Sequence, residues 1–497
     1  MELSKKIIHG LQYSAGINVP QSYIFALPEK VLQFGTGVLL RGLPDYFIDK
    51  ANKQAVFNGR VVVVKSTGGS ADDFAEQDSL YTHCINGVAD GKLVEQTIIN
   101  ASISRVLTAA NNWPDILACA ASPDMQVIIS NTTEVGIVLV DDDISAGVPK
   151  SFPGKLLAFL YERYKKLGGT PESGMAIVPT ELIVDNATKL KAIVLEQASR
   201  NKLEPEFITW LDTQNDFCNS LVDRIVPGKM AADKQAEMEA KIGYTDGLMI
   251  MSEVYSLWAI ETNNPATVAK LSFAQTDAGV VLAPSIEKFR ELKLRLLNGT
   301  HTFSCALAFL SGFETVAQAM ENDQFSTFVK DLMITEIAPC IVSDSISKEE
   351  AETFAGNVID RFKNPNIQHK WISISVQYTG KMKMRNVPLL LKHYSSSSTV
   401  PTHMAIGFAA YLQFLKPVEN KDNAYYGSVN GNSYKIDDEF ASWYYANWQG
   451  KTTEDAVKTS MSNTDIWGTD LTQLPGFYDT VLDYVKQFEA GDFSKAY

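Results

Sequence analysis

Short apolar runs that alternate with helical patterns constrain the fold of this chain most strongly. The runs are rich in β-branched residues and span Val31–Phe34, Arg60–Val64, Gln126–Ile129 and Gly174–Val178. Continuous apolar runs of this kind are typical of parallel strands that are buried on both faces. The segments between them are long enough for crossover helices. The pattern therefore predicts a Rossmann-type, doubly wound α/β sheet in the N-terminal part of the chain.

A glycine-containing turn follows the first of these strands directly. Its residues are Phe34, Gly35, Thr36 and Gly37, and a helical pattern comes next. Glycines at such a turn let the backbone approach a pyrophosphate at a helix N-terminus. The usual third glycine would fall at Leu40, and Gly42 comes two residues late. This degenerate fingerprint predicts a dinucleotide site at the turn.

The end of the second strand bears on the choice of dinucleotide. Lys65 stands there, where an acidic residue usually meets the adenosine ribose of NAD. A lysine at this point can instead meet a 2′-phosphate, and Asp72 and Asp73 lie a few residues further on. We expect NAD as the cofactor, with NADP left open and Lys65 within the site.

The sequence changes in character after about residue 284. Helical periodicity then dominates, in segments such as Lys348–Phe362 and Met404–Leu415. We therefore expect a dinucleotide-binding domain at 1–283 and a mainly α-helical substrate and catalytic domain at 284–497. Residues 417–437 are rich in Asn, Gly and Asp and indicate an exposed excursion.

Composition excludes several classes of protein. The formal charge is −14, which argues against a nucleic-acid binder and gives no basic stripe for a membrane surface. The five cysteines include no CxxC pair, so neither a disulfide framework nor a zinc signature is present. The N-terminus lacks an apolar signal core. We expect a cytoplasmic enzyme without a metal, either a monomer or a weak homo-oligomer, whose partner is a small-molecule substrate.

A lysine, an amide and an imidazole lie within nine residues, at Lys293, Asn298 and His301. A lysine amine can exchange a proton with an alcohol or ketone oxygen, and an amide can hydrogen-bond that oxygen as charge develops on it. Lys293 and His301 are eight residues apart, about 12 Å along a continuous helix. A catalytic arrangement therefore requires Lys293 to lie on a bend or at a helix start. The alternative is an ordinary amphipathic helix with a solvated lysine.

Several segments together resemble the mannitol dehydrogenase family of long-chain polyol dehydrogenases. The similar segments are Gln33–Gly37 with Leu40-Arg41, Gln77–Thr82, Ser130–Ile137, Phe152–Leu156, Asn219–Ile225, Lys293–His301 and Arg361–Pro365. Their order and spacing agree from about residue 30 to residue 415. The resemblance implies an NAD-dependent oxidoreductase that transfers a hydride without a metal.

The resemblance also implies roles for individual residues. Lys293 matches the general acid and base of the family, and Asn298 and His301 match its asparagine and histidine. Asn186 matches a further asparagine, although Leu182 marks a remodelled pocket, and Asp223 matches an aspartate near the active site, where an ion pair with Arg224 is the alternative. The similar segments add further cofactor-binding residues, which are Arg41, Asp78, Thr132 and Glu134.

Within the family, the chain is most similar to members that act on uronates. A substrate of this type, a ketouronate or the corresponding aldonate, carries a carboxylate that requires a cation. Lys383 and Arg385 belong to a cationic run that begins at Lys381 and are the candidates, with a solvated helix face as the alternative. His369 is a further pocket candidate. The other functions considered are a fructuronate reductase, a hexitol dehydrogenase and a catalytically inactive nucleotide-sensing protein.

Overall fold

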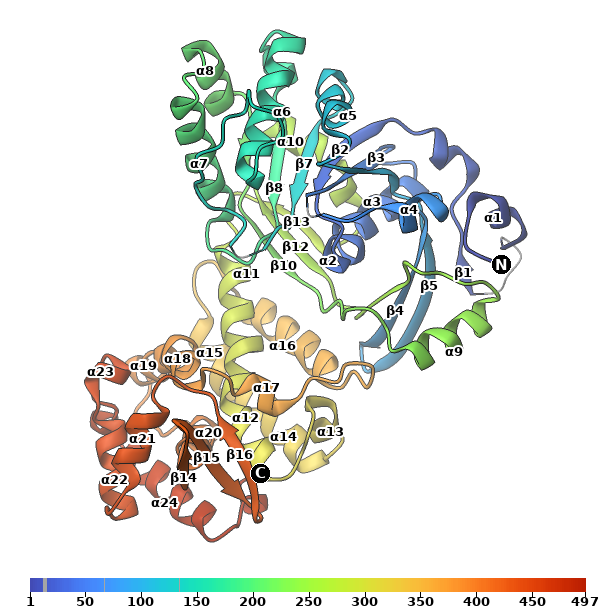
Figure 1. Cartoon of the computed structure of the whole chain (residues 1–497). Coiled ribbons are helices and arrows are strands. Elements are labelled where there is room, and N and C mark those ends of the chain that lie inside the picture. The colour runs from blue at the N-terminus through green and yellow to red at the C-terminus, as the bar shows by residue number, and fades with distance from the viewer. Residues whose placement is uncertain (12–15, 67, 134) are drawn as a thin grey trace. The chain divides into compact units, whose positions relative to one another are not determined.

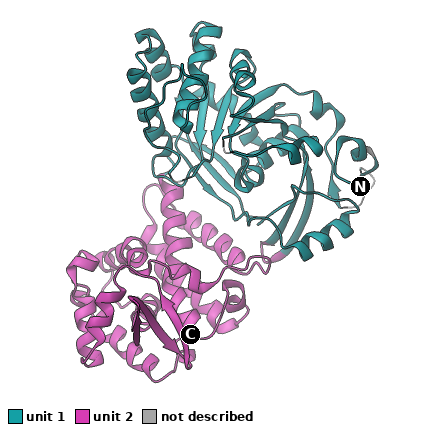
Figure 2. Cartoon of the chain, in the orientation of Figure 1, with its two compact units in different colours: residues 1–87, 93–286 teal, residues 88–92, 287–497 magenta. Residues whose placement is uncertain are grey.

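A computed structural model describes residues 1–11, 16–66, 68–133 and 135–497 of the chain. These residues form two compact units (Figure 2). Unit 1 comprises residues 1–87 and 93–286, and unit 2 comprises residues 88–92 and 287–497. Within the described ranges, no helix is long and apolar enough to cross a membrane.

A six-stranded parallel sheet lies at the centre of unit 1 (Figure 1). Its strands are β2 (Glu29–Phe34), β3 (Arg60–Lys65), β6 (Ile103–Thr108), β7 (Val127–Ser130), β8 (Ala176–Pro179) and β9 (Asp216–Phe217). Their order is β6-β3-β2-β7-β8-β9, so the chain reverses its direction across the sheet between β2 and β7. In sheets of this order, ligands bind beyond the carboxyl ends of the strands at that switch point. The predicted doubly wound fold is confirmed.

Both faces of this sheet are buried, which explains its uninterrupted apolar runs. Alternate residues of a strand point to opposite faces. Leu32 and Val62 pack with apolar residues of α6 (Phe152–Leu167), α7 (Asn186–Arg200) and α8 (Pro205–Thr213), which Figure 1 shows on one side of the sheet. Val31 and Val63 pack on the other side with α3 (Pro44–Lys53). A polar residue in either set would lose its hydration, so the strands have no polar face.

Two smaller sheets complete unit 1. One has the order β1 (Ile17–Asn18), β5 (Lys92–Asn100), β4 (Tyr81–Ala89) and β11 (Ile250–Ser252). The other has the order β10 (Ser220–Asp223), β12 (Leu257–Glu261) and β13 (Val280–Ala283). The remaining helices of this unit are α1 (Lys5–Leu11), α2 (Val38–Gly42), α4 (Asp72–Glu76), α5 (Trp113–Ala118), α9 (Ala232–Ile242) and α10 (Pro265–Lys270).

Unit 2 is mainly helical. Its helices are α11 (Glu287–Leu292), α12 (Thr300–Leu310), α13 (Val316–Met320), α14 (Asp323–Asp331), α15 (Ala338–Ile341), α16 (Lys348–Phe362), α17 (Trp371–Ile374), α18 (Tyr378–Lys381), α19 (Val387–Ser396), α20 (Thr402–Phe414), α21 (Ala441–Trp448), α22 (Thr453–Met461), α23 (Thr464–Trp467) and α24 (Phe477–Glu489). Helix α20 packs against both α12 and α24. A Cβ atom at Gly407 of α20 would lie 2.6 Å from the carbonyl oxygen of Phe303, so only glycine permits this close approach to α12.

Three π-helical segments interrupt the helices of unit 2. They are η5 (Lys293–Gly299), η6 (Leu332–Ile337) and η7 (Met382–Asn386). Pro339 follows η6 by two residues, and Pro388 follows η7 by two residues. Proline has no N–H, and its ring clashes with the carbonyl four residues earlier, so an α-helix cannot pass through it undisturbed. The two prolines therefore account for the wider turns in η6 and η7.

Residues 417–437 were expected to be an exposed excursion, and most of them are exposed, but they also have regular structure that the sequence analysis did not predict. They form an antiparallel sheet of β14 (Glu419–Lys421), β15 (Ala424–Val429) and β16 (Asn432–Ile436). The turns between these strands are Asp422-Asn423 and Asn430-Gly431, and all four residues have positive φ angles. Asn, Asp and Gly adopt this conformation most readily, and such two-residue turns join hairpin strands. The polar composition therefore belongs to the turns of a sheet.

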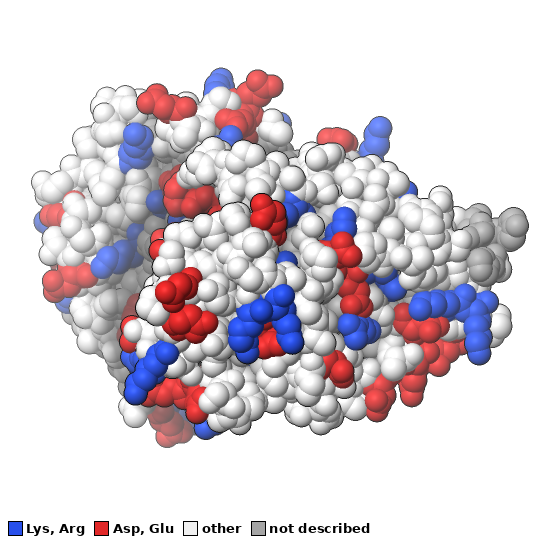
Figure 3. All heavy atoms as spheres, turned by 90° about the horizontal axis from the view of Figure 1, so that it is seen from above, with Lys and Arg blue, Asp and Glu red and all other residues white. Residues whose placement is uncertain are grey.

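The charged residues of the surface are mixed in sign. On the face shown in Figure 3, Lys and Arg side chains are interspersed with Asp and Glu side chains, and uncharged residues separate them. That face carries no extended patch of one sign. On this face, the acidic side chains therefore do not form a single acidic surface.

Candidate active site

The predicted glycine turn lies at the switch point of the sheet in unit 1. Gly35 follows β2 with a φ of 130°, and its N–H donates to the carbonyl of Val64 in β3. A Cβ atom there would lie 2.8 Å from Leu40 and 3.0 Å from the carbonyl oxygen of Asn131. The backbone conformation and the packing therefore both require glycine at this position.

Gly37 is different, because nothing within the chain requires it to be glycine. Its φ of −62° and ψ of 155° suit any residue, and no atom lies within 4 Å of the position of a Cβ. It precedes α2 and is exposed. Phe34 is buried against the ring of Phe152, and Thr36 is half-buried. The open space in front of Gly37 is where a bound molecule can approach the backbone.

A buried carboxylate fixes the neighbouring loop after β7. The backbone N–H of Thr132 donates to Glu181 at 2.9 Å, and the hydroxyls of Ser130 and Thr132 donate to the same carboxylate at 3.1 Å. Burial raises the pKa of Glu181, and these hydrogen bonds oppose that rise. Sequence reasoning did not assign Glu181 to the site. The available signal was its place directly after β8, at the edge of the sheet that also carries Gly35.

The other predicted cofactor residues of unit 1 have different surroundings. Arg41 is buried, donates to the carbonyl of Leu248 and lies over the ring of Tyr81. The amine of Lys65 donates to the carbonyl of Ser70. Asp78 accepts a hydrogen bond from the N–H of Lys5 at the start of α1. Glu134, the last predicted cofactor residue, lies outside the described residues. Arg41, Lys65 and Asp78 thus use their polar groups in contacts within unit 1.

Asn186 is committed to holding the backbone together. It is fully buried, and its amide nitrogen donates to the carbonyls of Pro179, Glu181 and Ser220, each at 3.1 Å. Its amide oxygen accepts from the N–H groups of Ala187 and Ser220. These five contacts use the hydrogen-bonding capacity of the side chain. The geometry therefore gives Asn186 a structural role and does not support the predicted contact with substrate.

Asp223 is buried at the end of β10, opposite Leu257 of β12. The neighbouring guanidinium of Arg224 donates to the carbonyl of Glu253 at 2.9 Å and 3.0 Å, and to the carbonyl of Gly42 at 2.8 Å. These hydrogen bonds of Arg224 all go to backbone oxygens. Arg224 thus ties the loop after β11 to the end of α2, beside the glycine turn.

In unit 2, the segment η5 carries both Lys293 and Asn298. In an α-helix, residues five apart are separated by about 140° around the axis. In a π-helix, residues five apart are joined by a backbone hydrogen bond, and the wider turn places them nearer to the same side. The sequence analysis required a bend or a helix start at Lys293. The structure instead has a π-turn, which brings Lys293 and Asn298 towards one side of a continuous helix.

His301 lies one turn further on, in an aromatic environment. It is 8% exposed, and its ring stacks on Phe362 with centroids 4.2 Å apart and an interplanar angle of 2°. His369 and Trp371 meet the ring edge-on at 5.1 Å and 6.0 Å. The Nε2 atom is buried and has no hydrogen-bond partner among the described residues. A buried polar atom without a partner costs free energy, so this nitrogen is a candidate contact for a ligand.

The electrostatic environment of His301 is positive. Burial holds the pKa of its imidazole well below the ordinary value. The positive neighbours lower it further, and they are His369, Arg361, Arg385 and Lys381. His301 is therefore neutral at physiological pH. Arg361, Arg385 and Lys381 are the cations among these neighbours, whereas the lowered pKa of His369 favours its neutral form, and an anion bound beside the three cations would gain free energy.

Within the predicted cationic run, Arg385 is connected to the catalytic candidate Asn298 through hydrogen bonds. Its guanidinium donates to the hydroxyl of Thr302 at 3.2 Å, and that hydroxyl donates to the carbonyl of Asn298 at 2.8 Å. Its Nε atom is buried and has no hydrogen-bond partner in the described part of the chain. The amine of Lys381 donates to the carbonyl of Ile374, and burial and Arg385 lower its pKa.

Lys383 faces elsewhere. Its side chain is exposed, and its amine donates to the carbonyl of Asp465 at 3.3 Å. His369, in contrast, is adjacent to His301, and burial and Lys381 lower its pKa. The structure thus brings Arg385 and His369 together with His301 and Asn298 but places Lys383 towards α23. Sequence reasoning used Arg361 and Phe362 only as parts of a motif, although both contribute to the surroundings of His301.

The described ranges contain no group of three or more His, Cys, Asp or Glu side chains that could hold a metal ion. The polar groups gathered around His301 are basic or neutral, and such a set suits an anion. A Rossmann-type unit with an open glycine turn, followed by a helical unit that carries a lysine, an asparagine and a histidine, defines an oxidoreductase of the two-domain dehydrogenase class.

Comparison with known proteins supports this class and specifies it. Residues 29–272 match the mannitol dehydrogenase Rossmann domain, and residues 285–489 match the mannitol dehydrogenase C-terminal domain. The altronate oxidoreductase of Halalkalibacterium halodurans is 37% identical over 490 residues, which cover 96% of this chain and 94% of that protein. The altronate oxidoreductase of Bacillus subtilis is 36% identical and covers 92% of each chain. This chain belongs to the mannitol dehydrogenase family, whose members are oxidoreductases that act on CH–OH groups.

Solved structures show the same fold. The mannitol 2-dehydrogenase of Pseudomonas fluorescens, in a ternary complex with NAD and D-mannitol, aligns with a TM-score of 0.67 over 100% of this chain and 98% of that chain, at 20% identity. A D-sorbitol dehydrogenase in substrate-free form aligns with a TM-score of 0.79 over the full length of both chains, at 19% identity. The predicted family and fold class are therefore confirmed.

Proposed function

We propose that this protein is an NAD-dependent tagaturonate reductase, also called altronate oxidoreductase, which interconverts D-tagaturonate and D-altronate in hexuronate breakdown. The observation that carries the proposal is the guanidinium of Arg385 in unit 2, which Thr302 holds beside Asn298 and whose buried Nε atom has no partner among the described residues. A neutral hexitol or ketose gains nothing from such a group, whereas a uronate carboxylate does. The altronate oxidoreductases that are similar over most of the chain support the same substrate.

The glycine turn of unit 1 fits a dinucleotide. Gly37 leaves open space beside an exposed backbone at the switch point of the sheet, and a pyrophosphate requires such a close approach. The Gly35–Gly37 backbone and the Glu181-tethered loop at Thr132 would hold it. A bound nicotinamide dinucleotide supplies the hydride that the ketone carbon accepts. Lys65 already donates to Ser70, which favours NAD over a dinucleotide with a 2′-phosphate.

Proton transfer is assigned to Lys293. As the ketone oxygen gains negative charge, the ammonium of Lys293 donates a proton to it, and in altronate oxidation the amine takes the proton back. Asn298, on the same side of η5, donates a hydrogen bond to that oxygen as its charge develops. His301 is neutral, and its Nε2 atom hydrogen-bonds a substrate hydroxyl.

The substrate carboxylate is assigned to Arg385. Its Nε atom is a buried donor without a partner among the described residues, and its NH1 atom is held by Thr302 beside Asn298. A planar guanidinium binds a carboxylate through two directed hydrogen bonds. Asp223 of unit 1 remains a candidate for contact with a substrate hydroxyl through its family match. The exposed Lys383 is not part of this proposal.

The test is an absorbance assay of NADH consumption with tagaturonate, fructuronate and fructose, repeated with NADPH. We expect efficient reduction of tagaturonate with NADH. A preference for fructuronate would reassign the enzyme to the other ketouronate. Equal efficiency with fructose would reject the uronate substrate. NADH binding without turnover of any of the three would favour a nucleotide-sensing protein.

A further inference from the structure

The π-helix η7 has a backbone carbonyl that its own helix cannot satisfy in the usual way. In an α-helix the carbonyl of Met384 would accept from the N–H of residue 388, but that residue is Pro388. The proline lacks the N–H, and its ring presses against the same carbonyl. A donor from another element at this carbonyl would therefore stabilise the segment that carries Arg385.

Arg295 of η5 supplies that donor. Its NH1 atom donates to the carbonyl of Met384 at 2.9 Å and to the carbonyl of Arg385 at 2.6 Å. Its Nε atom donates to Glu291 at 2.8 Å, so the guanidinium is held from both ends. The side chain of Arg295 is only 13% exposed. Through these contacts, the side chain of Arg295 connects the two π-helices η5 and η7.

A second contact ties the same two segments together. The amide nitrogen of Asn386 donates to the carbonyl of Gly299 at 3.0 Å. Asn386 and Arg295 thus link η7 and η5 at two points. Arg385 directly precedes Asn386 in η7, and its guanidinium donates to Thr302. The position of Arg385 relative to Lys293 and Asn298 therefore depends on these links. A shift of about 1 Å in such a group is enough to reduce catalysis markedly.

We propose that Arg295 is a positioning residue, which holds the backbone of Arg385 at the place where its guanidinium meets the substrate carboxylate. The inference rests on the proposed function in one respect, because it assumes that Arg385 binds that carboxylate. Arg295 itself lies on another side of the helix. Its guanidinium lines a pocket of about 450 Å³ together with residues of α11, α15 and α19.

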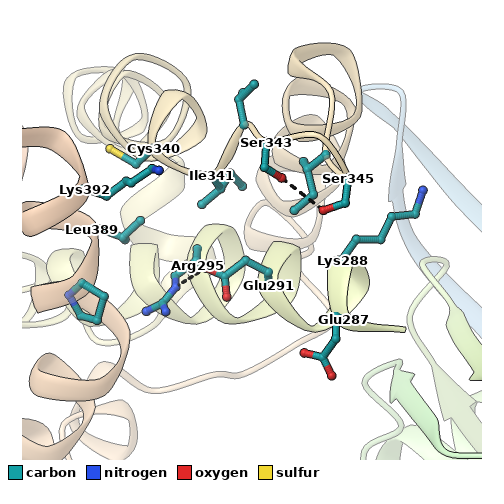
Figure 4. Close-up of a pocket in the computed structure, with 13 residues that line it drawn as sticks. Glu287, Lys288, Glu291, Arg295, Cys340, Ile341, Ser343, Ser345, Leu389 and Lys392 are labelled. Carbon is teal, nitrogen blue, oxygen red and sulfur yellow. Dashed lines mark hydrogen bonds and ion pairs between the residues drawn. The ribbon is translucent and has the colours of Figure 1, made fainter. Parts of the chain in front are cut away.

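This pocket provides matched controls. Figure 4 shows Arg295 paired with Glu291 on one wall and Lys392 of α19 on the opposite wall. Lys288 lines the same pocket and pairs with Glu350 at 2.8 Å. Among the described residues, the side chain of neither lysine forms a hydrogen bond to η7. Lys392→Met and Lys288→Met therefore remove a cation from the pocket and leave the two π-helices linked.

The first test is steady-state kinetics of Arg295→Met with tagaturonate and NADH. We expect KM for tagaturonate to rise about tenfold or more, with kcat within about threefold of wild type, because a uniform binding contact is weakened. Arg295→Lys restores a cation but not the two directed donors of a guanidinium, and we expect it to recover part of the loss. The two control variants should keep wild-type kinetics. A wild-type KM in Arg295→Met, or an equal rise in Lys392→Met, overturns the proposal.

A double-mutant cycle distinguishes positioning from an independent contribution. If Arg295 acts through Arg385, Arg295→Met should add less than about twofold to the KM of Arg385→Ala. If the increases in KM of the two single variants multiply in the double variant, Arg295 does not act through Arg385, and the proposal fails.

Hydrogen exchange provides a readout that needs no activity. Peptides that cover residues 382–392 should exchange faster in Arg295→Met and Arg295→Lys than in wild type, and unchanged in Lys392→Met, because opening of η7 becomes easier. Unchanged exchange in both Arg295 variants would refute the tie between the helices even if the enzyme proves to be a tagaturonate reductase. Faster exchange in an enzyme that prefers fructose would leave the tie intact and reject the proposed substrate.

Discussion

Arg385 and Lys383 lie two residues apart on η7, and they provide a direct test of the proposed carboxylate site. Arg385 contacts Thr302 beside Asn298 and has a buried Nε atom without a partner in the described ranges. Lys383 is exposed and contacts the carbonyl of Asp465. We expect Arg385→Ala to impair reduction of tagaturonate strongly and Lys383→Ala to leave it almost unchanged.

The magnitude follows from the kind of contact that is lost. A hydrogen bond to a charged group contributes about 2–3 kcal/mol when it is shielded from water. Since about 1.36 kcal/mol corresponds to a factor of ten, kcat/KM should fall roughly 30- to 150-fold in Arg385→Ala. An exposed lysine contributes little to a distant anion because water and salt screen it. Lys383→Ala should therefore stay within about twofold of wild type.

The assay measures kcat/KM for tagaturonate and for fructose in wild type, Arg385→Ala and Lys383→Ala. Thermal unfolding of each variant verifies that the fold is retained. The ratio of the two substrates should fall in Arg385→Ala alone, because fructose has no carboxylate to lose. Equal effects of the two substitutions, or an equal loss with both substrates, would refute the assignment of the carboxylate to Arg385.

Three further predictions concern single residues. Lys293→Ala should lower kcat by roughly 10²–10⁴, the usual contribution of a positioned general acid or base, while NADH affinity by fluorescence titration stays the same; a wild-type turnover number would show that η5 is only a structural helix. Gly37→Val should fold normally, since its backbone suits any residue and its surroundings are open, but should raise the NADH dissociation constant; unchanged NADH binding would reject the glycine turn as the cofactor site. Burial raises the pKa of Asp45 from 3.8 to about 7, and Gln33 hydrogen-bonds it. As pH rises, Asp45 loses its proton in the unfolded chain before it does so in the folded protein. The free energy of unfolding should therefore fall by roughly 3–4 kcal/mol between about pH 4 and pH 7. Urea unfolding of Asp45→Asn should not show this decline, because the asparagine has no proton to lose.

The Rossmann sheet could be predicted because its physical requirements appear locally in the sequence. Val61–Val64 is apolar at every position, and both faces of β3 are buried. Gly35 is required by a positive φ and by the close approach of Asn131. The sheet of β14–β16 was missed because few of its positions are buried and its turns are polar, so composition indicated only an exposed excursion.

The site was harder to predict because its geometry depends on distant partners. Asn186 has the residue type that a substrate contact requires, yet its amide is used by the backbone of two strands. Glu181 was missed because its burial comes from the loop after β7, which is far away in the sequence. The π-turn at Lys293 has no proline to indicate it, so local propensity gives an ordinary helix. The contacts of η5 with η7 come from residues about 90 positions away, which local propensity cannot show.

Net charge and local charge lead to opposite expectations for this chain, and the local charge decides what binds. The formal charge of −14 belongs largely to exposed carboxylates, and at physiological salt their influence decays over about 8 Å. The basic neighbours of His301 are partly buried, so their field is screened much less. A substrate carboxylate therefore meets an attractive potential only after it enters unit 2. In the proposed function, the negative net charge and capture of the substrate by Arg385 are therefore compatible, and selectivity for a ketouronate over a neutral ketose would rest on Arg385 and its basic neighbours.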